Sequence, residues 1–334
     1  MSSVYLEHRD AYHVPGARTK EEIDAALRRA AEAIANCDAL LFTAGAGMGV
    51  DSGLPDFRGT NGLWKDRDVA MTYEEMSDDK WFAEAYWSCK RGQEKVWLHS
   101  SWGQCSRRSP SMLCSHCCCP LVFTSNIDGM FEQAGFPAEK VVACHGDMHH
   151  LQCTKDSRKC KGLAEDRWDE VWPVACIPSG LGDQIDKGAL RFTDASALEA
   201  PYFRCPRCGC LARPNVWFCH DRNYVPRQCS IAQRRTYCDW VSGMQERRER
   251  LVVIECGGGM AIPSVRVEGE DAVQPCGEGS LLVRLNPTDC KVPSEMAVGL
   301  PLGARVGLER IDAALRARNA APGAAAAQPA RAAA

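Results

Sequence analysis

The sequence predicts an open α/β fold, in which helices cover a parallel β-sheet and a small cysteine-rich module is inserted into the sheet domain. Two observations support this prediction. Short apolar runs recur along the chain and are continuous rather than alternating, which is typical of parallel strands buried on both faces. Between residues 150 and 215 the pattern changes to cysteines, prolines and polar loops. With 334 residues, the chain has room for a large domain and a smaller one.

The expected elements follow in chain order. Thr19 and Glu22 have the spacing of a capping box, and residues 23–34 after them have helical periodicity. The run ALLF (39–42) predicts a buried strand. Further strands are expected at LVFT (121–124), KVVAC (140–144), LVVIE (251–255) and LLVRLN (281–286), and a last helix at 306–317.

These elements also predict how the chain is divided. We expect an N-terminal extension (1–18), a sheet domain (19–149 and 216–318), an inserted module (150–215) and a disordered Ala/Pro-rich tail (319–334). Residues 97–120 have no helical period, and four cysteines crowd into 114–119. A second metal site and an insertion are the alternatives for this segment.

The amino-acid composition limits the partners and the cellular location that we expect. The chain is 45% hydrophobic and 25% charged, with a net charge of −3 and a pI near 6.3, which argues against nucleic acid as a partner. The basic run ERRERL (246–251) is expected to be the solvated end of a helix. No apolar stretch resembles a signal peptide or is long enough to span a bilayer, so we expect neither secretion nor a membrane partner. The 20 cysteines then predict reduced thiols or metal ligands in the cytoplasm, with the nucleus as the alternative.

A glycine-rich segment follows the first predicted strand. Gly45, Gly47 and Gly49 allow the backbone to approach a pyrophosphate near the start of a helix. The dinucleotide fingerprint G-x-G-x-x-G is incomplete, because Val50 occupies its last position. From these glycines alone, a tight strand-to-helix turn is therefore the favoured interpretation.

A longer comparison makes this segment more specific. GAGMGVDSGLPDFRG (45–59) resembles the first signature of the sirtuins, the NAD-dependent protein deacylases. The other matching segments follow in the family's order and span most of residues 35–315: TSNIDGMFEQAG (124–135), CHGDMHHLQC (144–153), CPRCGCLARPNV (205–216), GGGMAIP (257–263) and VRLNP (283–287).

The resemblance implies a fold, an activity and a substrate. The fold is a Rossmann-like open parallel sheet with a small inserted zinc-binding module. The activity is that of an NAD-dependent protein-lysine deacylase (deacetylase), which transfers the acyl group of an acylated protein or peptide to ADP-ribose and releases nicotinamide and O-acyl-ADP-ribose.

The resemblance also implies catalytic residues. His145 would be the general base towards a ribose hydroxyl, a task suited to a side chain that titrates near neutral pH. His149 and His150 are rivals on composition alone, but the His-Gly pair after an apolar strand favours His145. Asn126 and Asp128 would hold the nicotinamide end, although both residue types also favour capped turns.

The cofactor-binding residues implied by the resemblance lie in three groups. Pro55 stiffens the first segment, where Asp56 and Arg58 have the spacing to hold a loop over a ligand. The implied NAD contacts are Gly45, Ala46, Gly47, Asp56, Phe57 and Arg58 in the first group, Ser125 and Ile127 in the second, and Gly257, Gly258 and Asn286 in the third.

Four cysteines are candidate zinc ligands. Cys205 and Cys208 have the spacing of a zinc knuckle. The resemblance pairs them with Cys153 and Cys160, whose six-residue gap is wider than usual, so Cys176 and Cys210 are alternatives. Zinc would be structural, because a small loop-rich module has too little core to fold without help. Free buried thiols are the other interpretation.

Departures from the family pattern keep other functions open. Gly49 stands where a serine is usual, Ser125 replaces a glutamine, and residues 219–221 replace the Phe-Gly-Glu that helps to clamp the acyl-lysine. A mono-ADP-ribosyltransferase or an NAD glycohydrolase on the same fold is the first alternative. A non-catalytic module that binds NAD or acyl-lysine is the second, and His145 argues against it because a binder needs no general base.

Overall fold

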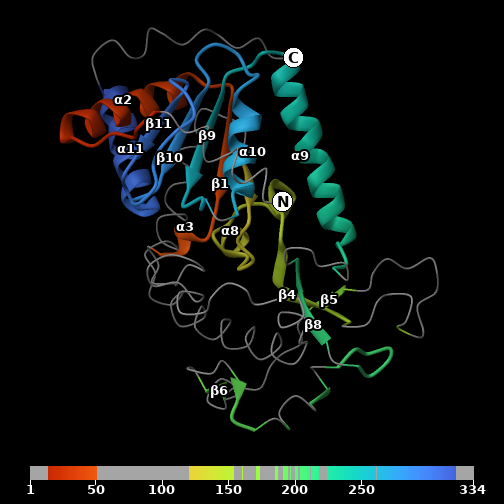
Figure 1. Ribbon diagram of the computed structural model, residues 1–334. Coiled ribbons are helices and arrows are strands. Elements are labelled where there is room, and N and C mark those ends of the chain that lie inside the picture. Colours follow the sequence, from red (N-terminus) through yellow and green to blue (C-terminus); the bar gives the residue numbers. More distant parts are fainter. Residues whose placement is uncertain are drawn as a thin grey trace. The chain divides into compact units, whose positions relative to one another are not determined.

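The computed structural model describes residues 14–50, 120–153, 160, 171–173, 185–186, 191–194, 196, 200–201, 204–210, 212–217, 224–260 and 262–320 (Figure 1). Among these, residues 14–50, 120–122 and those from 239 onward belong to one compact unit, and those from 123 to 238 to a second. Asp56, Phe57, Arg58, Cys176, residues 219–221, the segment 97–119 and the tail beyond 320 lie outside the described residues.

A six-stranded sheet confirms the predicted fold class. Its strand order is β11-β10-β9-β1-β2-β3. Strand β9 pairs in parallel with β1 and with β10, and β10 pairs in parallel with β11. The strands are β1 (Ala39–Ala44), β2 (Leu121–Thr124), β3 (Val141–Ala143), β9 (Leu251–Cys256), β10 (Leu281–Leu285) and β11 (Ala297–Leu300).

Every residue of β1, β9 and β10 is buried, which explains the continuous apolar runs in the sequence. Two charges interrupt this core. Glu255 on β9 and Arg284 on β10 are fully buried and form a bidentate ion pair at 2.8 and 2.7 Å. Removing one partner of such a pair costs about 3–5 kcal/mol, because the other charge is left buried and unpaired.

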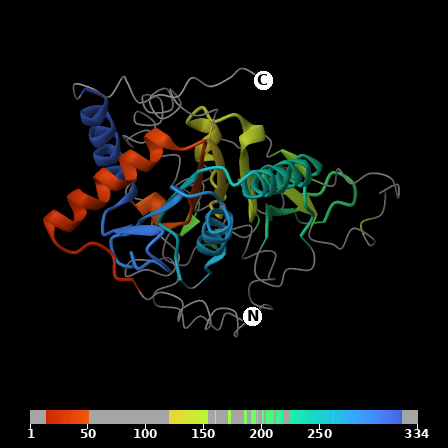
Figure 2. The ribbon, with the colours of Figure 1, turned by 90° about the horizontal axis from the view of Figure 1, so that it is seen from above.

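Helices cover the sheet of the first unit. The predicted capping box is present at the start of α2 (Lys20–Asn36), where Thr19 accepts a bond from the Glu22 amide and the Glu22 carboxylate accepts one from the Thr19 amide. Helix α11 (Ala304–Ala320) contains the predicted last helix and lies beside α2, while α10 (Ser264–Val273) packs on the other side of the sheet (Figures 1 and 2).

The basic run at 246–251 begins at the exposed end of a helix, as expected, since residues 246–248 are exposed. Helix α9 (Gln228–Glu246) ends where the run begins, and the run forms the turn into β9. Arg250 makes a bidentate pair with Asp38 at 2.9 and 3.0 Å. The run therefore leads from the solvated helix end to the start of β9, where Arg250 bonds the residue that precedes β1.

The second unit is built around β4 (Gly146–Cys153). It is the central strand of an antiparallel sheet between β5 (Val171–Pro173) and β8 (Ala212–Val216). The unit also contains α8 (Met130–Gln133), a 3-10 turn (Ala138–Lys140) and the hairpin of β6 (Ile185–Asp186) and β7 (Arg191–Phe192). No helix within the described ranges is both long and apolar enough to cross a membrane.

Candidate functional site

Two glycine loops pack against each other in the first unit. One follows β1 and leads into the short helix α3 (Gly47–Val50), and the other follows β9. The Gly47 amide donates to the Gly257 carbonyl at 3.1 Å. Gly257 has φ +63°, and a Cβ there would lie 2.2 Å from the Met48 nitrogen. The glycines are thus required by the contact between the loops, in addition to any contact with a ligand.

Asn286 stabilises loops at the end of β10. Its Nδ2 donates to the Gly258 carbonyl at 3.1 Å, while its Oδ1 accepts bonds from the amides of Thr288 and Asp289, both at 3.0 Å. The side chain is 8% exposed. Asn286 therefore fixes the positions of the loops after β9 and β10 relative to each other.

A turn after β2 contains the second group of predicted residues. The Asn126 amide donates to the Thr124 hydroxyl, and the Asp128 carboxylate accepts from the Met130 amide at 3.1 Å. Burial raises the pKa of Asp128 above its ordinary value despite that bond. The Asp128 side chain caps the turn, as the alternative interpretation predicted for it, and the side chains of Asn126 and Asp128 are half-buried.

His145 lies immediately before β4, within the same unit as this turn. Burial lowers the pKa of its imidazole, and a hydrogen bond to the backbone carbonyl of Ser125 opposes that shift. The Trp217 ring meets the imidazole edge-on, with centroids 5.8 Å apart. A neutral imidazole has a lone pair on one ring nitrogen, which can accept a proton.

Gly146 explains the His-Gly pair. Its φ is +79°, and a Cβ at this position would lie 2.1 Å from the Asn215 carbonyl oxygen on β8. The Trp217 amide donates to the His145 carbonyl at 2.8 Å. Strand β8 therefore approaches so closely that only glycine fits directly after His145.

A bulge in β4 gives the two rival histidines structural roles. Asp147 pairs with Asn215 on β8 and Leu151 with Pro214, so residues 148–150 have no partners on that strand. His149 Nε2 lies 2.9 Å from the Asp128 carbonyl oxygen, which connects the bulge to the turn after β2.

Asp147 forms a charged cluster at the same bulge. Its carboxylate lies 2.8 Å from His150 Nδ1 and 2.9 Å from Arg227 Nη2. Burial would raise the pKa of Asp147, but His150 and Arg227 outweigh it and the net pKa is lowered. Sequence reasoning missed this cluster, because Arg227 is 80 residues from Asp147 along the chain.

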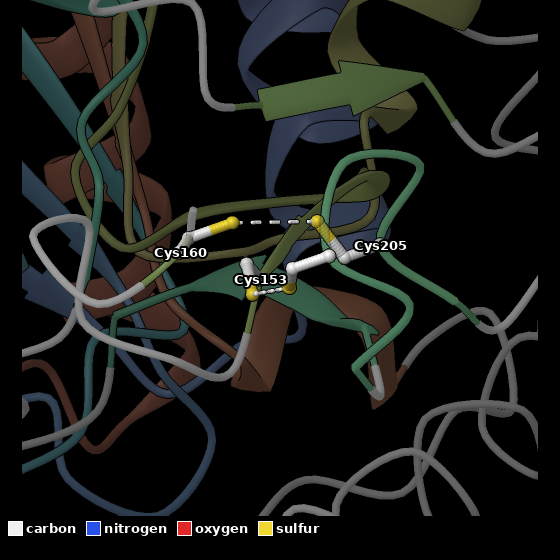
Figure 3. Close-up of side chains that lie close together, drawn as sticks. Cys153, Cys160 and Cys205 are labelled. Carbon is white, nitrogen blue, oxygen red and sulfur yellow. Dashed lines mark hydrogen bonds between the residues drawn. The ribbon is translucent and has the colours of Figure 1, made fainter. Parts of the chain in front are cut away.

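Four thiols converge at the far end of β4 (Figure 3). The Sγ atoms of Cys153, Cys160, Cys205 and Cys208 all lie within 4.8 Å of one another. The separations are 3.6 Å for Cys153–Cys208 and 3.7 Å for Cys160–Cys205. Four thiolates around Zn²⁺ at about 2.3 Å would lie about 3.8 Å apart, so the donor set fits zinc. Cys210 packs against this cluster but is outside the set of four.

The sequence of this chain matches the model of one protein family. Residues 45–241 match the model of the Sir2 family, which is more than half of the chain. The chain belongs to the Sir2 family.

Curated relatives of the Sir2 family are distant but numerous. The chain is 28% identical over 162 residues to NAD-dependent protein deacylase 2 of Pseudomonas aeruginosa, covering 45% of this chain and 59% of the relative. It is 27% identical over 222 residues to NAD-dependent protein deacylase of Thermococcus kodakarensis, covering 62% and 71%. A Fusarium oxysporum protein named probable bifunctional ADP-ribose hydrolase/ADP-ribosyltransferase is 31% identical over 153 residues, covering 46% and 23%. The matches thus span less than two thirds of the Pseudomonas and Fusarium relatives.

Solved structures of Sir2 proteins support the fold. The ADP-ribose complex of one mutant Sir2 homologue superposes with a TM-score of 0.53 at 18% identity, covering 87% of this chain and 97% of that one. The ADP-ribose complex of a second mutant gives 0.52 at 20% identity, with the same coverage of both chains. This similarity shows a common fold.

The first unit also fits the dinucleotide expected of a Sir2 protein. Gly259 is exposed, and a Cβ there would meet no described atom within 4 Å. The second glycine loop is thus closely packed at Gly257 and open at Gly259. Loops at the carboxyl ends of parallel strands are where open α/β sheets bind nucleotides.

Proposed function

We propose that the chain is an NAD-dependent protein-lysine deacylase. The observation that carries this proposal is His145, whose half-buried imidazole has a pKa lowered by burial, so that a neutral ring with one basic nitrogen persists at and above about pH 7. A side chain of this kind suits removal of a proton from a hydroxyl. Family membership and the names of the Pseudomonas and Thermococcus relatives support the same activity.

The residues near His145 have distinct proposed roles. Asn126 and Asp128 lie on a turn held by bonds to the Thr124 hydroxyl and to the Asp128 carboxylate, and they would position the nicotinamide end. Ser125 would fix the imidazole orientation, and Ile127 would pack beside the ring. NAD, when bound, supplies the ribose carbon to which the acyl oxygen is transferred.

The first unit would bind the rest of the dinucleotide. The backbone of the two glycine loops would contact its phosphates and ribose, at Gly45, Ala46, Gly47, Gly257 and Gly258. Asn286 would hold the loop after β10. The predicted contacts at Asp56, Phe57 and Arg58 remain part of the proposal and lie outside the described residues.

Zinc would stabilise the second unit. Cys153, Cys160, Cys205 and Cys208 would hold the ion, and its role would be structural because four protein ligands leave no open position. Its thiolates must stay reduced, which favours the cytoplasm as the location and an acylated protein or peptide there as the substrate.

The deciding experiment measures nicotinamide release from NAD with and without an acetyl-lysine peptide. We expect release that depends on the peptide and falls at least about 100-fold in His145→Ala. Release that is equal with and without peptide would contradict a deacylase.

A second candidate is ADP-ribosyl transfer or NAD hydrolysis on the same fold. The Fusarium relative, whose name includes ADP-ribosyltransferase, favours it, as does the altered sequence at 219–221. Labelled NAD distinguishes the two, because label retained on an acceptor protein indicates transfer, and label in acyl-ADP-ribose indicates deacylation.

A further inference from the structure

Arg266 connects the loops after β9 and β10 of the first unit. The residue lies on α10, and its side chain is completely buried. Its Nε donates to the Gly258 carbonyl at 2.9 Å, and its Nη2 donates to the Asp289 carbonyl at 2.7 Å. One guanidinium thus bonds the loop after β9 and the loop after β10.

The charge of Arg266 is balanced within the same cluster. Glu255 Oε1 lies 3.8 Å from Arg266 Nε, and Asp289 Oδ2 lies 3.4 Å from Nη2. Arg284 bonds Glu255 from the other side. A Cβ at Gly258 would lie 2.8 Å from Glu255 Oε1, so the Gly258 backbone rests directly on this ion cluster.

The bond to Gly258 also fixes the neighbouring donor. The peptide between Gly258 and Gly259 is planar and trans, so its N–H points opposite to its C=O. The C=O points to the buried Arg266 and Asn286 side chains. The Gly259 N–H therefore points away from these two side chains, and Gly259 itself is exposed.

We propose that Arg266 is a positioning residue for the nucleotide, which orients the Gly258–Gly259 peptide so that the Gly259 N–H donates to an oxygen of bound NAD. This inference rests on the proposed function and adds a residue that touches no ligand itself. Lysine cannot replace it, because a single ammonium lacks the fork that reaches both carbonyls.

The test compares Arg266→Lys with Arg250→Lys. Both changes remove the fork of an arginine in the first unit, but Arg250 pairs with Asp38 just before the amino end of β9, away from the loops after β9 and β10. The probe is ADP-ribose, with affinity measured by calorimetry. We expect the Kd to rise about tenfold in Arg266→Lys and to stay within about twofold in Arg250→Lys, even where both lower Tm equally.

Turnover provides the second readout. The KM for NAD should rise in Arg266→Lys while the KM for the acyl peptide stays constant, a split that general destabilisation would not produce. Equal ADP-ribose affinity in the two variants would overturn the inference. Wild-type protein that binds neither NAD nor ADP-ribose would instead overturn the proposed function.

Amide exchange on the unchanged chain covers the case in which Arg266→Lys does not fold. The Gly259 amide should exchange rapidly in the free protein and become protected when ADP-ribose is added. Failure of ADP-ribose to protect this amide, at saturating ligand, would overturn the inference as well.

Discussion

His145 has an environment that sets the pH range of the proposed reaction. Burial lowers its pKa, so the neutral imidazole persists to a lower pH than in an exposed histidine. We expect kcat/KM to stay level from about pH 8 down to about 6.5, the ordinary histidine value, and to fall only below it. A profile of peptide-dependent nicotinamide release measures this, and a decline that begins above about pH 7 would contradict it.

Gly146 is a residue at which a side chain should be costly. We expect Gly146→Ala to lower the free energy of unfolding by at least about 2 kcal/mol, because positive φ strain adds to a backbone clash with Asn215. Urea unfolding measures the change. Gly209→Ala is the matched control, since Gly209 has a similar φ of +70° but no atom within 4 Å of its Cβ. An equal loss in both variants would exclude the clash as the cause.

Individual residues were predicted correctly where a short sequence motif defines their role. The four cysteines that converge at the end of β4 follow from spacing and family resemblance, and the capping box from a four-residue pattern. Asp147 and Arg266 could not be predicted, because their partners are distant in sequence and only the fold brings them together. The assignment of Asn286 to the ligand stays a prediction, to which the structure adds that the side chain bonds its own loops.

The bulge in β4 bonds two other segments, the turn after β2 through His149 and the segment of Arg227 through Asp147. Its Asp147 carboxylate has a pKa below the ordinary value, so the ion pair contributes stability above about pH 4 and loses it as the pH falls through the folded pKa. We expect Asp147→Asn to lower the free energy of unfolding at about pH 7 by about 1–3 kcal/mol, because Arg227 loses a charged partner.

Urea unfolding at several pH values tests this. The difference between wild type and Asp147→Asn should shrink below about pH 4, where the wild-type carboxylate becomes protonated. Asp312→Asn is the control, since Asp312 pairs with a largely exposed Arg316 on α11 and should cost less than about 1 kcal/mol. A pH-independent difference for Asp147→Asn would contradict the electrostatic explanation.

Elements were predicted best where burial is uniform. Strands β1, β9 and β10 are buried at every residue, so their sequences are continuously apolar. Strand β11 was missed because AVGL is short and contains a glycine. Only the end of helix α9 was predicted, at the basic run 246–251, because among its described side chains Tyr237 and Met244 alone are deeply buried, which leaves no apolar stripe.

At the scale of the whole molecule, the second unit should depend on zinc. We expect one zinc ion per chain, and we expect Cys205→Ser to lose it together with most of the cooperative unfolding of this unit. Elemental analysis and thermal unfolding measure both. Cys210→Ser should retain the metal, because Cys210 only packs against the four ligands. Zinc bound equally by Cys205→Ser would contradict the assignment.

Strand β4 begins next to His145 and ends at Cys153, so the proposed base and one proposed zinc ligand belong to a single strand. A molecule without zinc would therefore lose the ordered structure of the whole strand, and with it all activity, instead of retaining a reduced kcat. A preparation with half its zinc should therefore behave as a mixture of fully active and inactive molecules. Its kcat per chain would be halved and its KM values unchanged, so specific activity would report the zinc content of the sample.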